Sequence, residues 1–558
     1  MGRRSLLAPA LAAAFPILFL YAHNAGQVTA ASVVPVLLVA VAVAVLLALA
    51  LRLLLRDHVQ ASLTATVWIL LFFLYGHVSQ ALNGIEIGGL GLGAPAVLLP
   101  LWLVAAAVPL VPASHRKMRN LNVLPYATGA LGVVVVLNVA TVGMTEAGRL
   151  GDGGGAQDSG VTLNGSGSSE PPDIYYIVPD RYPSPQVSEE YLAYDNSEFM
   201  GFLEDSGFYI ADETFANYHA TYLSLASSLN MEYLDALAGE VGDDRGDHTT
   251  AHRMMEDNEI WRILKEQYGY DFVHFGSWWG PTEENPNADV SINKPPRLLG
   301  LIELRDEFSR LLLRTSVLGP FQDWFLRQDT FVREEAEVEQ CNRINVGSRH
   351  PNDVAREQCH RALYAFEQLK EMPSTEGPKF VFVHLLIPHP PFVFAADGEV
   401  IEDPPAFYYW DAVTDEEVDV LKQSKVEQIK YTNTRLQESI EHILEASDQP
   451  PIIILQSDEG PWTHEYQHSP REEWTPETFR TRHGIINAYH FPGVDAEAAL
   501  YPSITPVNTF RVIFNEYFNA DLPLLEDRAY MSASDDDVYN FIDVTQQARP
   551  TERADLYR

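Results

Sequence analysis

Hydrophobic residues gather in the first quarter of the chain, in five long runs at positions 6–22, 29–51, 61–82, 90–111 and 123–144. Each run has, or nearly has, the roughly 20 apolar residues that a helix needs to cross the hydrocarbon core of a membrane. The pattern therefore predicts an N-terminal bundle of five transmembrane helices over residues 1–144. The first run has a second interpretation, a cleaved signal peptide.

The basic residues of this region lie only in alternate loops. They precede the first run and follow the second and fourth runs, whereas positions 23–27 and 83–89 contain no lysine or arginine. Because positively charged loops remain in the cytoplasm, the segment after Met144 is expected outside the membrane. This holds whether or not the first run is cleaved. We predict a multi-pass protein of the plasma membrane with an extracytoplasmic catalytic domain.

The rest of the chain alternates between two patterns. A Gly/Ser-rich linker is expected at 145–172. Short β-rich runs at 173–180, 270–279, 379–392, 451–460 and 484–489 alternate with helical patterns at 221–230, 260–268, 353–371 and 415–446. Such alternation is typical of an α/β domain with a mostly parallel central sheet, here predicted over 173–530. A polar C-terminal tail is expected at 531–558.

One amphipathic stretch, at 297–330, interrupts this alternation. Its apolar residues include Leu304, Phe308, Leu311 and Leu312. We expect a helix that packs on the α/β domain. The alternative is a helix that lies in the membrane interface.

Charge is distributed very unevenly. Only two of the 76 acidic residues and seven of the 38 basic residues precede position 145, which leaves a net charge of −43 for residues 145–558. This balance argues against a nucleic-acid partner and against docking on anionic lipid through a basic patch. It is also typical of salt-adapted proteins. The two cysteines, Cys341 and Cys359, both lie on the predicted outer side, where we expect a disulfide. Two buried free thiols are the alternative.

Polar residues at predicted strand and helix ends are the candidates for chemistry. Asp180 ends an early strand, and Asp458 with Glu459 follows a late one. Thr221 stands where a helix is predicted to begin, either as an N-cap or as a nucleophile. Ligands collect at strand ends in parallel sheets, so these four residues could surround one divalent metal ion. A solvated acidic loop is the alternative for the acid pair. His389, which lies among three prolines, could bind metal, contact phosphate, donate a proton or simply occupy a turn.

The order of these motifs resembles the alkaline phosphatase superfamily: strand–Asp, Thr-helix, Pro-His-Pro, then Ser-Asp-Glu-Gly. Within it, the chain is most similar to the membrane-anchored lipoteichoic acid synthases and lipid A phosphoethanolamine transferases, which carry five spans and an extracytoplasmic sulfatase-like domain. The resemblance implies that Asp180 is the first metal-binding acid and Thr221 the nucleophile. It implies that Asp458 and Glu459 are the late metal-binding pair, and that His389 contacts the phosphate or a second metal.

Two departures from the family pattern qualify these roles. Glu459 stands where the family usually has histidine, and an all-oxygen ligand set favours Mn²⁺, Mg²⁺ or Ca²⁺ over Zn²⁺. The same change could instead signal a weakened or lost metal site, and a second metal is left open. Sulfatases carry Cys or Ser followed by Pro and Arg where this chain has Thr221-Tyr-Leu-Ser. Sulfate ester hydrolysis is therefore disfavoured.

Four further residues are candidates for substrate binding. Residues 264–279 resemble a sulfatase segment that ends near the active site, which implies that Ser277 and Trp278 contact substrate. His384 lies at a predicted strand end. His483 precedes the last predicted strand, where related transferases keep a second-metal histidine.

The leading functional interpretation is a transferase. It would move the phosphoryl headgroup of a membrane phospholipid, through Thr221, to a glycan or lipid acceptor of the envelope. One alternative is a metal-dependent phosphodiesterase, phosphatase or sulfatase-like hydrolase. Another is a catalytically impaired, membrane-tethered binding protein.

Overall fold

The chain forms two compact units in the computed structural model. The N-terminal unit comprises Met1–Gly153 and Pro295–Phe331, and the α/β unit comprises Gly154–Lys294 and Val332–Arg558. The structure describes residues 6–24, 30–82, 85–87, 90–111, 123–151, 171–237, 246, 248–293, 297–298, 302–303, 307–321, 340–344, 352–405, 414–534 and 537–550.

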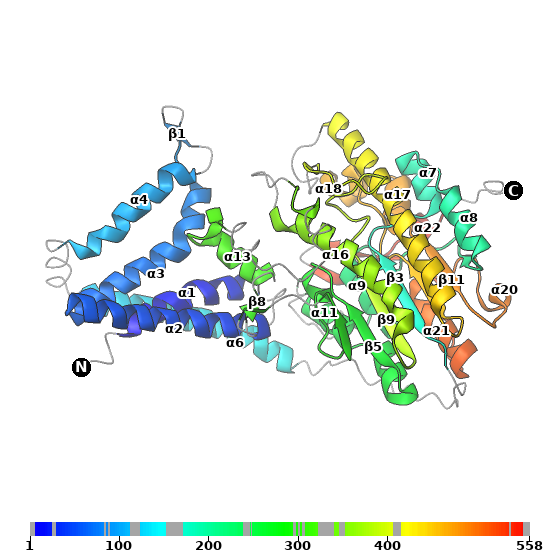
Figure 1. Cartoon of the computed structure of the whole chain (residues 1–558), viewed down its shortest axis with the longest axis horizontal. Coiled ribbons are helices and arrows are strands. Elements are labelled where there is room, and N and C mark those ends of the chain that lie inside the picture. Colours follow the sequence, from blue (N-terminus) through cyan, green and yellow to red (C-terminus); the bar gives the residue numbers. More distant parts are fainter. Residues whose placement is uncertain are drawn as a thin grey trace. The chain divides into compact units, whose positions relative to one another are not determined.

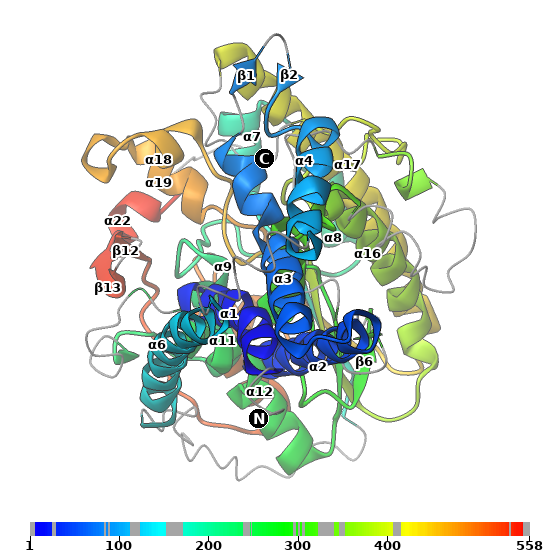
Figure 2. The ribbon, with the colours of Figure 1, turned by 90° about the vertical axis from the view of Figure 1, so that its left-hand side faces the viewer.

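Apolar helices make up most of the N-terminal unit (Figure 2). They are α1 (Leu7–His23), α2 (Ala30–Leu55), α3 (His58–Ala81), α4 (Pro95–Ala107) with the 3₁₀ turn η2 (Val108–Leu110), and α6 (Val123–Gly151). A short hairpin, β1 (Glu86–Ile87) and β2 (Leu90–Gly91), precedes α4. Among the described residues, three segments are long and apolar enough to cross a membrane: Val33–Leu55, His58–Ala81 and Val123–Met144. The other two expected spans coincide with shorter apolar helices, Leu7–His23 and Pro95–Leu110.

The amphipathic stretch forms α13 (Glu307–Thr315), and this helix belongs to the N-terminal unit. Phe308 is 2% exposed and packs in a cluster with Ile17 and Phe73. The amide of Val317 donates to the carbonyl of Phe72, 2.7 Å away. The prediction that this helix packs on the α/β domain is therefore wrong: its apolar face fits the equally apolar surface of α1 and α3.

A seven-stranded sheet organises the α/β unit. Its strand order is β4 (Tyr209–Ile210), β11 (Asn487–His490), β10 (Ile452–Gln456), β3 (Ile174–Pro179), β9 (Lys379–Leu385), β5 (Asp271–Phe275) and β6 (Val290–Ile292). The strand β11 runs antiparallel to both of its neighbours, β10 and β4, and the other four strand pairs of the sheet are parallel. The predicted mostly parallel sheet is confirmed, and each expected strand forms.

Helices cover both faces of this sheet, because each central strand is apolar on both sides (Figure 1). One face, called here the α9 face, packs against α9 (Thr221–Asn230), α11 (Thr249–Glu256) and α21 (Pro506–Phe518). The opposite face packs against α16 (Asn352–Glu371) and α17 (Asp415–Ala446). Successive strand residues alternate between these faces, as Tyr176 and Ile177 do.

Smaller elements complete the α/β unit. They are α7 (Pro185–Leu192), α8 (Ser197–Asp205), α12 (Glu259–Arg262) with the π turn η3 (Ile263–Gln267), α18 (His464–His468), α19 (Pro476–His483) and α20 (Ala496–Ala499).

The predicted polar tail folds instead of extending. It contains the hairpin β12 (Tyr530–Ser534) and β13 (Asp537–Asp543), followed by α22 (Thr545–Ala548), which lies beside α19 (Figure 2). Met531 is buried against Phe215, so the unit extends past residue 530. Residues 145–151 of the expected linker continue α6, and its residues 152–170 lie outside the described residues. The expected disulfide between Cys341 and Cys359 is confirmed.

Candidate functional site

Three side chains converge where β3, β9 and β10 end. Asp180, His384 and Asp458 each offer a ligand atom, and these atoms lie within 4.8 Å of one another. Strand alternation explains the convergence. Tyr176, Phe382 and Ile454 belong to the α9 face, and each ligand follows one of them by an even number of positions. The three ligands therefore point to the side of the sheet on which α9 packs.

The three side chains are buried but incompletely bonded. Asp180 is 2% exposed, and His384 and Asp458 are each 3% exposed. The Oδ1 atom of Asp180, the Nε2 atom of His384 and the Oδ2 atom of Asp458 have no hydrogen-bond partner among the described residues. An unsatisfied buried polar atom costs about 1–3 kcal/mol, and two adjacent carboxylates also repel each other. These orphaned atoms fit a divalent cation, which would satisfy all three.

The two carboxyl groups have opposite pKa shifts. Burial, together with the carboxylates of Asp180 and Glu459, raises the pKa of Asp458 to about 7. Burial also acts to raise the pKa of Asp180, but His389, His384 and Arg181 together hold it below its ordinary value. Repulsion between two neighbouring carboxylates separates their pKa values in this way, because the ionisation of one group disfavours that of the other.

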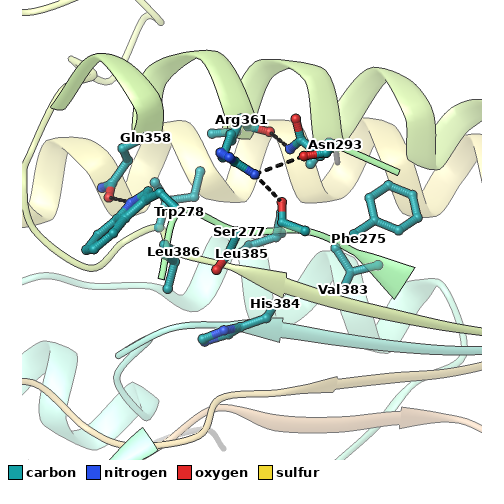
Figure 3. Close-up of a pocket in the computed structure, with 14 residues that line it drawn as sticks. Phe275, Ser277, Trp278, Asn293, Gln358, Arg361, Val383, His384, Leu385 and Leu386 are labelled. Atoms are coloured by element: carbon teal, nitrogen blue, oxygen red, sulfur yellow. Dashed lines mark hydrogen bonds between the residues drawn. The ribbon is translucent and has the colours of Figure 1, made fainter. Parts of the chain in front are cut away.

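His384, predicted as a substrate contact, is oriented as a metal ligand would be. Its Nδ1 atom lies 2.9 Å from the Thr282 hydroxyl, which in turn lies 2.7 Å from the Ser277 hydroxyl. This arrangement leaves Nε2 for the converging group, and such second hydrogen bonds usually fix a ligand histidine. Ser277 therefore reaches the site through Thr282. In Figure 3, His384 points to the opposite side of β9 from Arg361.

Thr221 is the first residue of α9, and Ala220 occupies the N-cap position. The interpretation of Thr221 as a side-chain N-cap is therefore wrong. Its hydroxyl instead lies beside the carboxyl group of Asp458 and lowers the pKa of that group. A partly buried hydroxyl thus stands at the helix N-terminus, beside the converging ligands.

Glu459 does not join this group. One of its oxygens accepts from the Nε atom of Arg181 at 2.6 Å, and the other accepts from Arg482. Gly460 permits this pairing, because a Cβ atom there would come within 2.1 Å of the Thr481 carbonyl oxygen. The expectation of an all-oxygen site rested on Glu459, so the preference for Mn²⁺, Mg²⁺ or Ca²⁺ loses its basis. The converging atoms comprise one nitrogen and two carboxylate oxygens.

His389 and Trp278 lie together near this centre. Their ring centroids are 6.0 Å apart. Gln358 links them: it accepts from the Trp278 indole at 2.9 Å (Figure 3), and it donates to the His389 carbonyl at 2.6 Å. Burial and the Arg181 charge lower the pKa of His389 to about 3, so its imidazole is neutral at pH 7. A neutral imidazole can bind a metal, whereas so low a pKa makes it a weak base and leaves it without the proton of an imidazolium to donate.

His483 lies outside the converging group. It is fully buried, and its Nδ1 atom lies 2.9 Å from the Ala216 carbonyl oxygen. Burial lowers its pKa to about 4. This environment is that of a neutral histidine that supports the segment leading into α9.

Four residues near the centre escaped the sequence analysis as functional candidates: Arg181, Lys425, Trp462 and Arg482. Arg181 adjoins Asp180 in sequence, and Arg482 precedes the last sheet strand, so position offered a signal for both. Lys425 lies in the middle of the charged helix α17, where sequence offers no signal. Its ammonium group donates to the Arg181 carbonyl at 3.0 Å, and burial lowers its pKa to about 7.

No protein-family model and no curated protein matches the chain. Among solved structures, it is similar to the zinc complex of the C-terminal periplasmic domain of EcEptC from Escherichia coli, at 11% identity and TM-score 0.41, over 68% of this chain and 95% of that one. It is similar to the corresponding domain of phosphoethanolamine transferase EptC from Campylobacter jejuni, at 12% identity and TM-score 0.35, over 64% of this chain and 92% of that one.

A third similar structure is the phosphonate monoester hydrolase of Agrobacterium radiobacter, at 12% identity and TM-score 0.37, over 64% of this chain and 79% of that one. A 2-O GAG sulfatase is also similar. The chain is thus similar to phosphoethanolamine transferase domains and sulfatase-like proteins, the kinds of protein that its motif order resembles.

Proposed function

We propose that this protein is a membrane-anchored, metal-dependent transferase of the sulfatase-like alkaline phosphatase superfamily, with Thr221 as its nucleophile. It takes the phosphoryl headgroup of a membrane phospholipid and passes it to a glycan or lipid acceptor of the envelope. The observation that carries this proposal is the convergence of Asp180, His384 and Asp458 beside the Thr221 hydroxyl.

Asp180, His384 and Asp458 would hold the divalent metal ion. When bound, the ion supplies Lewis acidity beside the hydroxyl and the phosphoryl group. The Thr221 oxygen forms a bond to phosphorus while the bond between phosphorus and the diacylglycerol oxygen breaks. The proton lost by the hydroxyl passes to the departing alcohol. An acceptor hydroxyl then attacks phosphorus, the bond to Thr221 breaks, and the threonine hydroxyl regains a proton.

The membrane anchor suits such a substrate. Within the described part of the N-terminal unit, three apolar segments are long enough to span a membrane, and an anchor keeps an enzyme at the surface where its lipid donor resides. The proposal places the α/β unit outside the cytoplasmic membrane, on the side that the alternating basic loops predict.

The test uses the full chain in detergent, incubated with mixed micelles of phosphatidylethanolamine or phosphatidylglycerol. Mass spectrometry should find a headgroup adduct on the peptide that contains Thr221. The adduct should disappear in Thr221→Ala and persist in a control on an exposed threonine, Thr434→Ala.

Metal content, measured by elemental analysis, separates the remaining alternatives. Asp458→Asn should lower metal content and adduct formation together. Diacylglycerol release with free headgroup but no acceptor product would indicate a hydrolase. If neither the parent nor Asp458→Asn binds metal, and the parent yields no adduct, the proposal is contradicted and a binding protein is favoured.

A further inference from the structure

Beside the converging ligands lies a second cluster, of opposite charge, formed by Arg181, Glu459, Trp462 and Arg482. The pairing of Glu459 with both arginines leaves one positive charge in excess. With Asp180, Asp458 and a divalent cation added, the surplus is still one positive charge, before Lys425 is counted. A buried site with such a surplus favours an anion.

The two arginines of this cluster are bonded differently. Both Nη atoms of Arg482 donate to backbone carbonyls, those of Gly460 and His219, and one also reaches Glu459. The Arg181 guanidinium uses only its Nε atom, which donates to Glu459. Its two Nη atoms have no hydrogen-bond partner within the described part of the chain, although the side chain is only 8% exposed. Arg181 therefore keeps two donors available where Arg482 does not.

The Arg181 side chain is held rigidly. Its guanidinium carbon lies 3.7 Å from the centroid of the Trp462 ring, and its Nε atom is 3.9 Å from the Asp180 carboxylate. Stacking and a planar fork reduce the entropy lost when arginine binds an oxyanion. The guanidinium group that carries the available donors thus lies next to Asp180, one of the converging residues.

The backbone at Arg181 is also unusual. Its φ angle is 58°, in the left-handed region that non-glycine residues seldom occupy. The conformation is secured on both sides: the Arg181 amide donates to Asp458 at 3.3 Å, and the carbonyl accepts from Lys425 at 3.0 Å. Strained conformations persist where the surrounding structure holds them and cluster at functional sites.

We propose that Arg181, positioned by Glu459 and Trp462, binds the non-bridging oxygens of a phosphoryl group at this centre, so that the site works with one metal ion and a guanidinium in the place of a second. This inference rests on the proposed function and specifies how its anionic substrate is recognised. The planar fork of arginine offers two parallel hydrogen bonds to a phosphate. Arg482 and Glu459 are positioning residues: both Nη atoms of Arg482 already donate within the protein, and the Glu459 carboxylate accepts from both arginines.

The test compares the full chain in detergent with Arg181→Gly, which suits the positive φ angle. Elemental analysis gives the metal content, and isothermal titration with inorganic phosphate gives the affinity for the anion. We expect one metal ion per chain in both proteins and about a tenfold to hundredfold weaker affinity for phosphate in the variant. Added guanidinium ion, but not sodium at equal ionic strength, should restore part of that affinity.

A matched control is Arg262→Gln, which removes a guanidinium paired with Asp257 and Glu259 on α12, and should change neither quantity. Arg181→Lys keeps the charge and loses the fork, so it should fall between parent and Arg181→Gly. It also serves if the glycine variant fails to fold.

Three results would overturn the inference: two metal ions in the parent, unchanged phosphate affinity in both Arg181 variants, or loss of metal together with phosphate binding. Failure of the proposed function has a different signature. In that case the parent itself holds no metal, or forms no adduct on Thr221, whatever residue stands at position 181.

Discussion

Thr282 supports the candidate metal centre without belonging to it. Its hydroxyl is 2% exposed and lies between the Nδ1 atom of His384 and the Ser277 hydroxyl. Thr282→Val keeps the shape of the side chain and removes this link. We expect about a tenfold to hundredfold loss of metal affinity, the range typical for partners of ligand histidines. Titration of the metal-stripped chain measures it.

The control for this change is Thr375→Val, which removes an exposed hydroxyl bonded to the Met372 carbonyl. It should leave metal affinity unchanged. Equal affinities for the parent and Thr282→Val would show that the hydrogen bond does not hold His384 in place.

His483 makes stability depend on pH. Its pKa is lowered by burial to about 4, whereas an unfolded histidine titrates near 6.5. The unfolded chain therefore binds more protons between these values. The contribution of neutral His483 to the free energy of unfolding is complete above about pH 6.5. It declines as the pH falls and is lost by about pH 4. The contribution is about 3 kcal/mol at most.

Urea unfolding of the full chain in detergent, followed by tryptophan fluorescence at pH 7 and pH 4.5, measures this effect. His483→Gln should lose stability at pH 7 and show a smaller difference between the two pH values. Other buried histidines with lowered pKa values, such as His219 and His274, share the direction of the effect, so part of the slope should remain. An unchanged slope would mean that His483 titrates normally in the folded protein.

Among the elements, α7 ends in a conformation that suits its sequence poorly. Ala193 occupies the C-cap with a φ angle of 52° and is exposed. Glycine adopts this conformation without the steric cost of a Cβ atom, so Ala193→Gly should stabilise the α/β unit by about 0.5–1 kcal/mol. Ala498→Gly, at an exposed helical position in α20, should destabilise it by a similar amount. A lower urea midpoint for Ala193→Gly would contradict the prediction.

The sheet and its main helices could be predicted because their signals are local. The apolar runs that form β3, β9 and β10 are short and bounded by polar residues, and α16 and α17 repeat apolar residues at helical spacing. The reversed direction of β11 has no local signal, because the hydrophobic pattern of a strand does not depend on its direction in the sheet. The packing partner of α13 was also predicted wrongly, because an amphipathic pattern indicates that a helix has a buried face but does not identify the surface that covers it.

The candidate site could be predicted only in part, because some of its contacts join residues that are far apart in the sequence. Asp180, Thr221 and Asp458 end or begin strong local patterns and come together as expected. His384 was expected near the site, but its role depends on register: it lies opposite Val178 on β3, and both point to the α9 face. Glu459 adjoins a ligand in sequence yet turns towards Arg482, a residue 23 positions away. Partners so far apart in sequence emerge only from the folded chain.

For the whole molecule, the distribution of charge predicts its orientation in the membrane. The alternating basic loops predict that the α/β unit lies outside, and the Cys341–Cys359 disulfide agrees with an oxidising compartment. A fluorescent reporter that matures only in the cytoplasm, fused after Arg558, should remain dark. The same reporter fused after Arg56, in a predicted cytoplasmic loop, should fluoresce and serves as the control. Fluorescence from the first fusion would place the α/β unit on the cytoplasmic side.

The assignment of α13 to the N-terminal unit bears on how the α/β unit can be isolated. Residues before and after Pro295–Phe331 belong to the α/β unit, so three chain connections join the two units, and a single cut in the linker leaves the other two intact. A soluble fragment that begins at residue 171 would expose Phe308 to water and should aggregate. Replacing residues 295–331 with a short Gly/Ser connection removes this apolar segment and keeps every strand of the central sheet, which makes the shortened fragment the better candidate for crystallisation.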